Sequence, residues 1–214
     1  MAFPQQLSDT WNFLHGEVVW LHGRWSMFNQ LYATSEVRLE ALNRVAPTFF
    51  GTLQRVLLND VQLALSRLGD PSRMGRRENL TLETLMEAIN DLQEHALAVE
   101  LSTDLGVFRE RCTMIVMRRN QWIAHHDISL RSPAERLPGV SRQEIEQALD
   151  QLRIFMRRVY SHYMNSHMAY EMFVLNDDAN NIVRAVAEAL RYRELMNQGT
   201  IDHADFITSN YARI

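Results

Sequence analysis

Residues 117–127, which read MRRNQWIAHHD, gather the side chains most able to do chemistry in this chain. Arginines can clamp a phosphate, and histidines can give and take a proton near pH 7. Together they suffice to break an RNA phosphodiester without a metal. A base removes the 2′-hydroxyl proton, that oxygen attacks the adjacent phosphorus, and a cation stabilises the charge on the phosphate oxygens.

The spacing in this segment leaves the pairing of arginine and histidine open. Residues six apart on a regular α-helix are rotated by about 240° and separated by about 9 Å along the axis, so Arg119 and His125 would not share a face. Residues seven apart nearly do, which pairs Arg118 with His125 and Arg119 with His126. An Arg119–His125 site therefore needs either a helix that ends near residue 124 or an arginine and a histidine from different subunits.

The elements that must position this segment are marked by apolar residues spaced three and four apart. They predict helices over about 8–31, 34–45, 47–68, 81–104, 107–125, 141–174 and 179–197, with a short interruption near 102–106. The expected helix starts are Ser8, Thr34 or Ser35, Pro47, Thr81, and a capping box of Ser141 with Glu144. We therefore expect an all-α fold, an antiparallel bundle of about six or seven helices.

Length and composition favour one helical domain over residues 1–197. The chain has 214 residues, 46% of them hydrophobic, and a single cysteine, so we expect a packed core without disulfides. The remaining residues, 198–214, are expected to be a mobile or docking tail. We find no window of 18 apolar residues and no signal-like opening, so we expect a cytoplasmic protein with no membrane segment.

The charge is mildly acidic overall but locally basic. All 22 basic residues are arginine, and the formal net charge is −4, which disfavours strong non-specific binding to nucleic acid. Two groups of arginines could still guide RNA to a cleft: Arg73, Arg76 and Arg77 in a loop, and Arg157 and Arg158 in a later helix. The alternative is a solvated surface paired with the acidic region 81–104.

Motifs of other enzyme classes are missing from the sequence. It contains no G-x-G-x-x-G, G-x-x-x-x-G-K, H-E-x-x-H or G-x-S-x-G, and no Glu precedes a histidine by three residues. His15 and His22 lie seven apart and would share a helix face, but structural histidines are the favoured interpretation. We expect no metal site and no cofactor.

The 117–127 segment resembles the motif of the HEPN superfamily, which is an arginine and a polar residue followed by a histidine after a short gap. Here Arg119 and Asn120 precede four residues and then His125. The ending His126-Asp127 looks like that of the abortive-infection branch, and residues 14–25, LHGEVVWLHGRW, are similar to the start of AbiU-like abortive-infection proteins. The resemblance extends over about residues 1–195.

This resemblance implies an all-α homodimer with metal-independent endoribonuclease activity, at a site where the motif helices of two subunits meet. It implies that His125 is the general base or acid, that Arg119 binds the scissile phosphate, and that Asn120 orients the phosphate or the histidine. Secondary candidates for positioning are Arg118, His126 and Asp127. Cleavage would leave a 2′,3′-cyclic phosphate and a 5′-hydroxyl.

The resemblance further implies a role in phage defence or as a toxin, with RNA as substrate and an antitoxin or regulatory protein as a candidate partner. One alternative is a catalytically inactive helical dimer that binds RNA or a protein, in which the Arg–Asn–His group only caps a helix end. A scaffold that binds no nucleic acid is the third interpretation.

Overall fold

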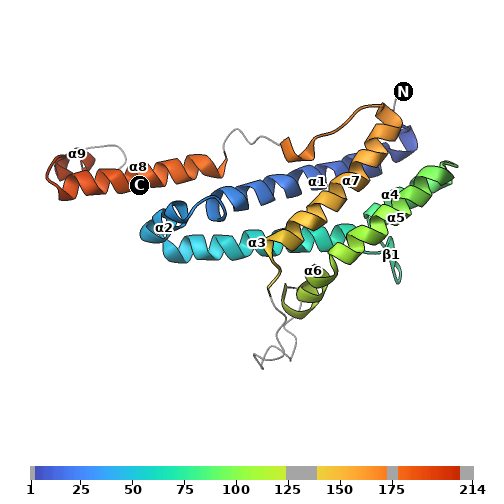
Figure 1. The fold of residues 1–214 in the computed structure, drawn as a ribbon, viewed down its shortest axis with the longest axis horizontal. Coiled ribbons are helices and arrows are strands. Elements are labelled where there is room, and N and C mark those ends of the chain that lie inside the picture. Colours follow the sequence, from blue (N-terminus) through green and yellow to red (C-terminus); the bar gives the residue numbers. More distant parts are fainter. Residues whose placement is uncertain (1–2, 124–138, 173–177, 208–214) are drawn as a thin grey trace. The chain divides into compact units, whose positions relative to one another are not determined.

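The computed structural model describes residues 3–123, 139–172 and 178–207, and helices dominate these ranges (Figure 1). The elements in chain order are α1 (Gln5–Tyr32), α2 (Glu36–Val45), α3 (Pro47–Gly69), β1 (Arg73–Met74), β2 (Arg77–Glu78), α4 (Leu82–Asp91), α5 (His95–Arg111), α6 (Thr113–Arg118), the π-helical turn η1 (Arg119–Ile123), α7 (Arg142–Met164), the 3₁₀ turn η4 (Tyr170–Met172), α8 (Ala179–Asn197) and α9 (His203–Ile207). The predicted all-α fold is therefore confirmed. The loop expected after residue 69 contains one short hairpin, whose two strands have two residues each.

Capping residues begin several of these helices where the sequence predicts. Ser35, Thr81 and Ser141 each accept a hydrogen bond from the backbone N–H three residues further on. Ser141 forms the expected capping box with Glu144. Pro47 is the first residue of α3, where its missing N–H costs nothing.

Other boundaries differ from the prediction. Helix α1 starts before Ser8, whose hydroxyl donates to the Pro4 carbonyl at 3.2 Å instead of capping the helix. Helix α5 runs without interruption through 102–106, and the break lies earlier, where Gln93 adopts a φ of 66°. Helix α7 ends at Met164, about ten residues early, because Asn165 takes the left-handed conformation that terminates helices.

The chain divides into two compact units. Unit 1 comprises Met1–Trp25 and Leu57–Val174, and unit 2 comprises Ser26–Val56 and Leu175–Ile214. The residues that carry the motif all belong to unit 1. The predicted domain boundary at residue 197 stays a prediction.

Unit 1 is built around α5, which packs against α4 and α7 (Figure 1). Arg111 of α5 donates to the Gln147 side chain, and Gln151 donates to the Asp104 carbonyl, so these two helices run antiparallel. The fully buried side chains between the helices of this unit include Leu85, Ile89, Leu101, Phe108, Ile115 and Phe155. This core anchors the stretch that leads into the motif.

Helices α1 and α3 are linked within unit 1 by two ion pairs. Arg24 Nε lies 2.8 Å from Asp60 Oδ2, and Arg67 Nη2 lies 4.0 Å from Glu17 Oε2. Residue numbers rise along one helix as they fall along the other, so α1 and α3 are antiparallel. The last turn of α3 therefore lies beside Glu17 of α1, and the chain then enters the hairpin.

Unit 2 pairs α2 with α8. Gln30 Nε2 donates to Asp178 Oδ2 at 2.9 Å, and Arg38 Nη1 donates to Asn180 Oδ1 at 2.7 Å. Asp178 also caps α8. None of the helices in the described ranges is long and apolar enough to cross a membrane.

Candidate functional site

The motif arginines lie where the regular helix gives way to a wider turn. Helix α5 ends at Arg111, α6 ends at Arg118, and Arg119–Ile123 then form a single π turn. The sequence predicts one continuous helix over 107–125 instead. Single π turns within helices are rare and occur often at functional sites. The rotation per residue of a regular α-helix therefore does not hold over Arg119–Ile123.

Arg119, the first residue of this turn, is held by two side chains, those of Asp70 and Asn120. Its Nη1 donates to both carboxylate oxygens of Asp70, at 2.9 and 3.0 Å, and its Nε donates to Asn120 Oδ1 at 3.1 Å. The Arg119 and Asp70 side chains are only 16% and 22% exposed. Within the described ranges, hydrogen bonds thus engage Nε and Nη1 and leave Nη2 to bind another acceptor.

Asp70 itself lies directly after α3, at a point that α5 holds in place. Arg109 Nε donates to the Gly69 carbonyl at 2.9 Å, and the Asp70 N–H donates to the Arg67 carbonyl at 3.2 Å. A Cβ at Gly69 would lie 3.2 Å from the buried ring of Phe108. The backbone at residue 69 therefore sits close against α5, and this contact fixes the origin of the Asp70 side chain.

The other side of Asp70 is tied down by Glu83. Its Oε2 accepts the Ser72 N–H at 2.7 Å, and its Oε1 accepts from Arg109 Nη1 at 3.1 Å. Burial disfavours the charged form of Glu83, but the hydrogen bonds from Arg109 and Ser72 outweigh it and lower the pKa of this carboxyl. Arg109 and Glu83 therefore bridge Gly69 and Ser72, the two residues that flank the Asp70-Pro71 segment.

The neighbouring motif residues are placed less tightly. Asn120 is exposed apart from its contact with Arg119, and Arg118 is half-buried. The Nε of Arg118 is shielded from solvent and makes no hydrogen bond to the described residues. Predicted site residues His125, His126 and Asp127 lie outside the described residues, so their pairing with the arginines stays a prediction.

The arginines predicted in the first RNA-guiding group form the hairpin. Arg73 is on β1, Arg77 is on β2 and Arg76 is in the turn between them, and all three are exposed. Arg73 Nη2 lies 3.6 Å from Glu78 Oε1, and both side chains are more than three-quarters exposed. These arginines are therefore accessible to a ligand.

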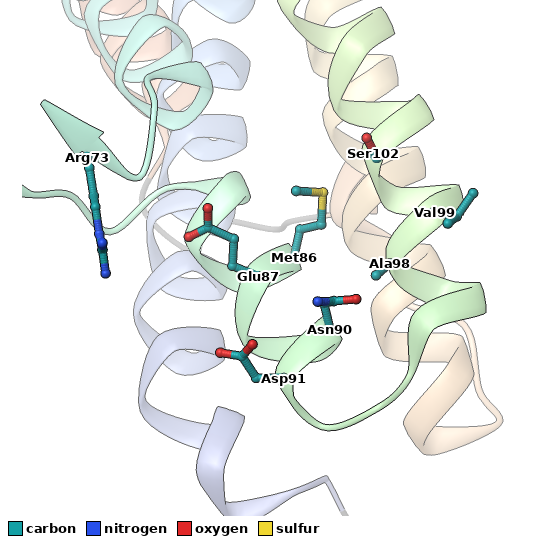
Figure 2. A pocket seen from close by; sticks show the side chains of 8 residues that line it. All are labelled: Arg73, Met86, Glu87, Asn90, Asp91, Ala98, Val99 and Ser102. Atoms are coloured by element: carbon teal, nitrogen blue, oxygen red, sulfur yellow. The ribbon is translucent and has the colours of Figure 1, made fainter.

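Arg73 also borders a pocket of about 510 Å³ between α4 and α5. Figure 2 shows Met86 and Asn90 pointing from α4 toward α5, which carries Ala98, Val99 and Ser102, while Glu87 and Asp91 lie on the side of α4 nearer Arg73. The charged side chains of the lining are two carboxylates and one arginine, a balance that does not favour the phosphate backbone of RNA.

The second predicted group, on α7, is paired with acids. Arg158 donates through Nε and Nη2 to Asp104 and through Nη1 to Glu100. Arg157 donates to the Met168 carbonyl and to Glu171. The contacts of Arg158 match the alternative interpretation, in which arginines pair with the acidic region 81–104, whereas the partners of Arg157 lie outside that region. RNA binding by this group stays a prediction.

Three further titratable groups of unit 1, His22, Cys112 and Tyr170, are buried in the core, and His15 is half-buried. His22 is 6% exposed, its Nδ1 donates to the Val18 carbonyl at 2.8 Å, and burial lowers its pKa to about 4. His15 Nδ1 and the Tyr170 hydroxyl are 3.0 Å apart, and burial raises the pKa of Tyr170. Burial also raises the pKa of the Cys112 thiol to about 12, so this cysteine is no nucleophile at neutral pH. In the part of the chain that the structure describes, no group of three or more His, Cys, Asp or Glu side chains could hold a metal.

Asp70 is the residue of this site that the sequence did not single out. It lies 49 residues before Arg119, in the loop segment GDPSRMGRRENL at 69–80. The only signal there is that an acidic residue directly follows a helix end. The close approach of Gly69, at the end of α3, to Phe108 and Arg109 of α5 is what brings it to Arg119.

Three comparisons with known proteins complete the description. The family model for AbiU2, of the HEPN group, matches residues 5–182, a segment that includes Arg119, Asn120 and His125. No curated protein matches the chain. No solved structure matches it either.

Proposed function

The chain belongs to the AbiU2 family of HEPN proteins, and on this premise we propose that it is a metal-independent endoribonuclease that acts in phage defence or as a toxin. Its substrate would be cytoplasmic RNA. The observation that carries the proposal is the set of hydrogen bonds that the Arg119 guanidinium makes. Its guanidinium is held at two nitrogens by Asp70 and Asn120, and among the described residues no acceptor engages Nη2.

An arginine in this state suits a phosphate. Planar guanidinium N–H groups match the oxygens of a phosphate, and a donor fixed in advance stabilises charge that develops in the transition state without reorganising. Asn120 would hold the guanidinium from the side of Nε. The charge on the non-bridging oxygens would therefore be met by a cation already in position.

The chemistry needs a proton carrier as well as a cation. We assign this role to His125, which follows Arg119 by the spacing of the family motif. The 2′-oxygen attacks phosphorus and the 5′-oxygen leaves. His125 would either take the proton of the 2′-hydroxyl or give a proton to the leaving 5′-oxygen. The products would be a 2′,3′-cyclic phosphate and a 5′-hydroxyl. Arg118, His126 and Asp127 would assist in positioning.

We further propose that two copies of the chain form the complete site. HEPN motifs of two subunits would meet, so that the arginine of one chain and the histidine of the other contact one phosphate. The exposed hairpin arginines Arg73, Arg76 and Arg77 would guide RNA toward this site by their charge. An antitoxin or regulatory protein is the candidate partner that would silence it.

Incubation of total RNA with the purified protein in EDTA tests the proposal. We expect wild-type protein to cleave RNA and both Arg119→Ala and His125→Ala to lose cleavage while remaining folded by circular dichroism. Intact RNA with wild-type protein, or equal cleavage by wild type and variants, would contradict it.

One observation favours a second function, an inactive dimer that binds RNA or a protein. The Arg119 charge is already partly neutralised by the Asp70 carboxylate, as in a purely structural ion pair. In that case the wild-type protein would shift RNA in a gel without cutting it, and Arg119→Ala would lower stability and leave the shift unchanged.

A further inference from the structure

We propose that Asp70 is the positioning residue that orients Arg119 for phosphate binding. The inference rests on the proposed function, because it assigns Asp70 a part in the same reaction. Asp70 would not touch the RNA. It would act by fixing where the guanidinium of Arg119 points.

The contacts determine the orientation of the guanidinium. Nη1 donates to both Asp70 oxygens at 2.9 and 3.0 Å, and Nε donates to Asn120 Oδ1 at 3.1 Å. Two nitrogens of a rigid planar group are thus fixed by acceptors of the protein, which leaves the group no freedom to turn about its long axis. The direction of the Nη2 N–H bonds follows from the other two.

Asp70 can impose this orientation because its own place is determined from both sides. Arg109 holds the Gly69 carbonyl, Glu83 holds the Ser72 N–H, and Arg109 and Glu83 are paired with each other at 3.1 Å. Asp70 therefore belongs to a closed ring of contacts on the rigid elements α3, α4 and α5. A carboxylate on a mobile loop would follow the arginine instead of directing it.

An orienting role differs from a merely structural ion pair in its kinetic signature. A misdirected arginine still attracts RNA by its charge, so the KM would change little. The transition state requires exact alignment with the phosphate oxygens, and misplacement of about 1 Å can cost about a hundredfold in rate. Loss of Asp70 would therefore appear mainly in kcat.

The kinetic test compares Asp70→Ala and Asp70→Asn with wild type on a labelled RNA in EDTA. We expect kcat to fall by about ten- to a hundredfold in Asp70→Ala with KM changed by less than about threefold, and by less in Asp70→Asn, which keeps one acceptor for Nη1. The matched control is Asp60→Ala, which breaks the Arg24–Asp60 pair in the same unit and should leave kcat unchanged. If Asp70→Ala does not fold, Asp70→Asn carries the test.

A second readout does not depend on activity. Phenylglyoxal modifies accessible guanidinium groups, and peptide mapping measures the labelling rate of Arg119 separately from that of Arg118. We expect Arg119 to be labelled slowly in wild type and in Asp60→Ala, and several times faster in Asp70→Ala. Equal labelling, or a kcat equal to or above the wild-type value in both Asp70 variants, overturns the inference and leaves the proposed function standing. Wild-type protein that cleaves no RNA overturns the proposed function and the role of Asp70 with it.

Discussion

Arg119 and Arg158 each end a pair of adjacent arginines in unit 1, and each is held by a carboxylate. They differ in how much of the guanidinium the protein uses. Arg158 donates through all three nitrogens, to Asp104 and Glu100, whereas the described contacts of Arg119 engage Nε and Nη1. Two adjacent arginines therefore do not by themselves indicate a phosphate site, because in Arg158 all three nitrogens already donate to carboxylates of the protein.

The backbone around the two arginines differs as well. Arg158 lies within the regular helix α7, where its neighbours three and four residues away occupy the same face. Arg119 opens a π turn at the end of α6. The regular geometry of α7 keeps the side chains of one face directed at α5. The wider π turn changes the angle between successive side chains over Arg119–Ile123.

Replacing Arg119 or Arg158 with alanine is expected to give the largest difference between the two regions, in RNA cleavage and in stability. We expect Arg119→Ala to lower RNA cleavage by about a hundred- to a thousandfold, the cost of removing one donor to transition-state charge. Arg158→Ala should leave cleavage unchanged and lower the free energy of unfolding by about 2 kcal/mol, because Asp104 is buried and would lose a charged partner. Single-turnover cleavage assays and urea unfolding measure the two effects. A large loss of cleavage in Arg158→Ala would break the distinction.

The pH dependence of stability tests the buried His22, which lies outside the motif. The pKa of His22 is lowered to about 4, mainly by burial and further by the charges of Arg153 and Arg157, so folding disfavours its protonation. Since the unfolded histidine takes up a proton near pH 6.5, stability is present above that pH and is lost as the pH falls toward 4.

We expect the His22 contribution to lower the free energy of unfolding by about 2 kcal/mol between pH 8 and pH 5. Urea titrations of wild type and His22→Gln at both pH values measure it, and the variant should lose less stability over the same interval. His15, whose pKa burial also lowers, remains in both proteins and acts in the same direction. An equal loss in wild type and variant would remove His22 as the cause.

Much of the fold follows from the sequence because its signals are local. Capping residues and the apolar periodicity predict the starts of α2, α3, α4 and α7, since both depend on neighbours within one or two turns. The break at Gln93 and the left-handed Asn165 carry weaker signals. Gly106, which suggests an interruption, lies within α5, because a glycine in a long packed helix costs only about 1 kcal/mol.

The candidate site is less predictable, because its contacts are long-range. Residues 119 and 120 are marked by residue type and by the family motif. The pairing of Arg119 with Asp70 spans 49 residues, and it depends on how closely α3 approaches α5 at Gly69. No periodicity or local motif encodes such an approach.

The smallest expected effect comes from a substitution that tests the close contact between α3 and α5 at Gly69. Gly69→Ala would place a Cβ 3.2 Å from the Phe108 ring, so we expect it to lower the free energy of unfolding by about 1 kcal/mol and to reduce kcat severalfold by moving Asp70. The matched control is Gly106→Ala, in an open position of α5, which should raise stability by about 0.5–1 kcal/mol and leave kcat unchanged. Thermal unfolding and the cleavage assay measure both variants. Equal effects of the two would show that the contact with Phe108 does not matter.

The chemical identity of the RNA ends is the most direct measurement of the central claim, that Arg119 and His125 perform transesterification without a metal. Mass spectrometry of a short RNA digested in EDTA should detect 2′,3′-cyclic phosphate and 5′-hydroxyl ends with wild-type protein and none with His125→Ala. Fragments that carry 5′-phosphate and 3′-hydroxyl ends, or cyclic phosphates that persist in the variant, would contradict the account.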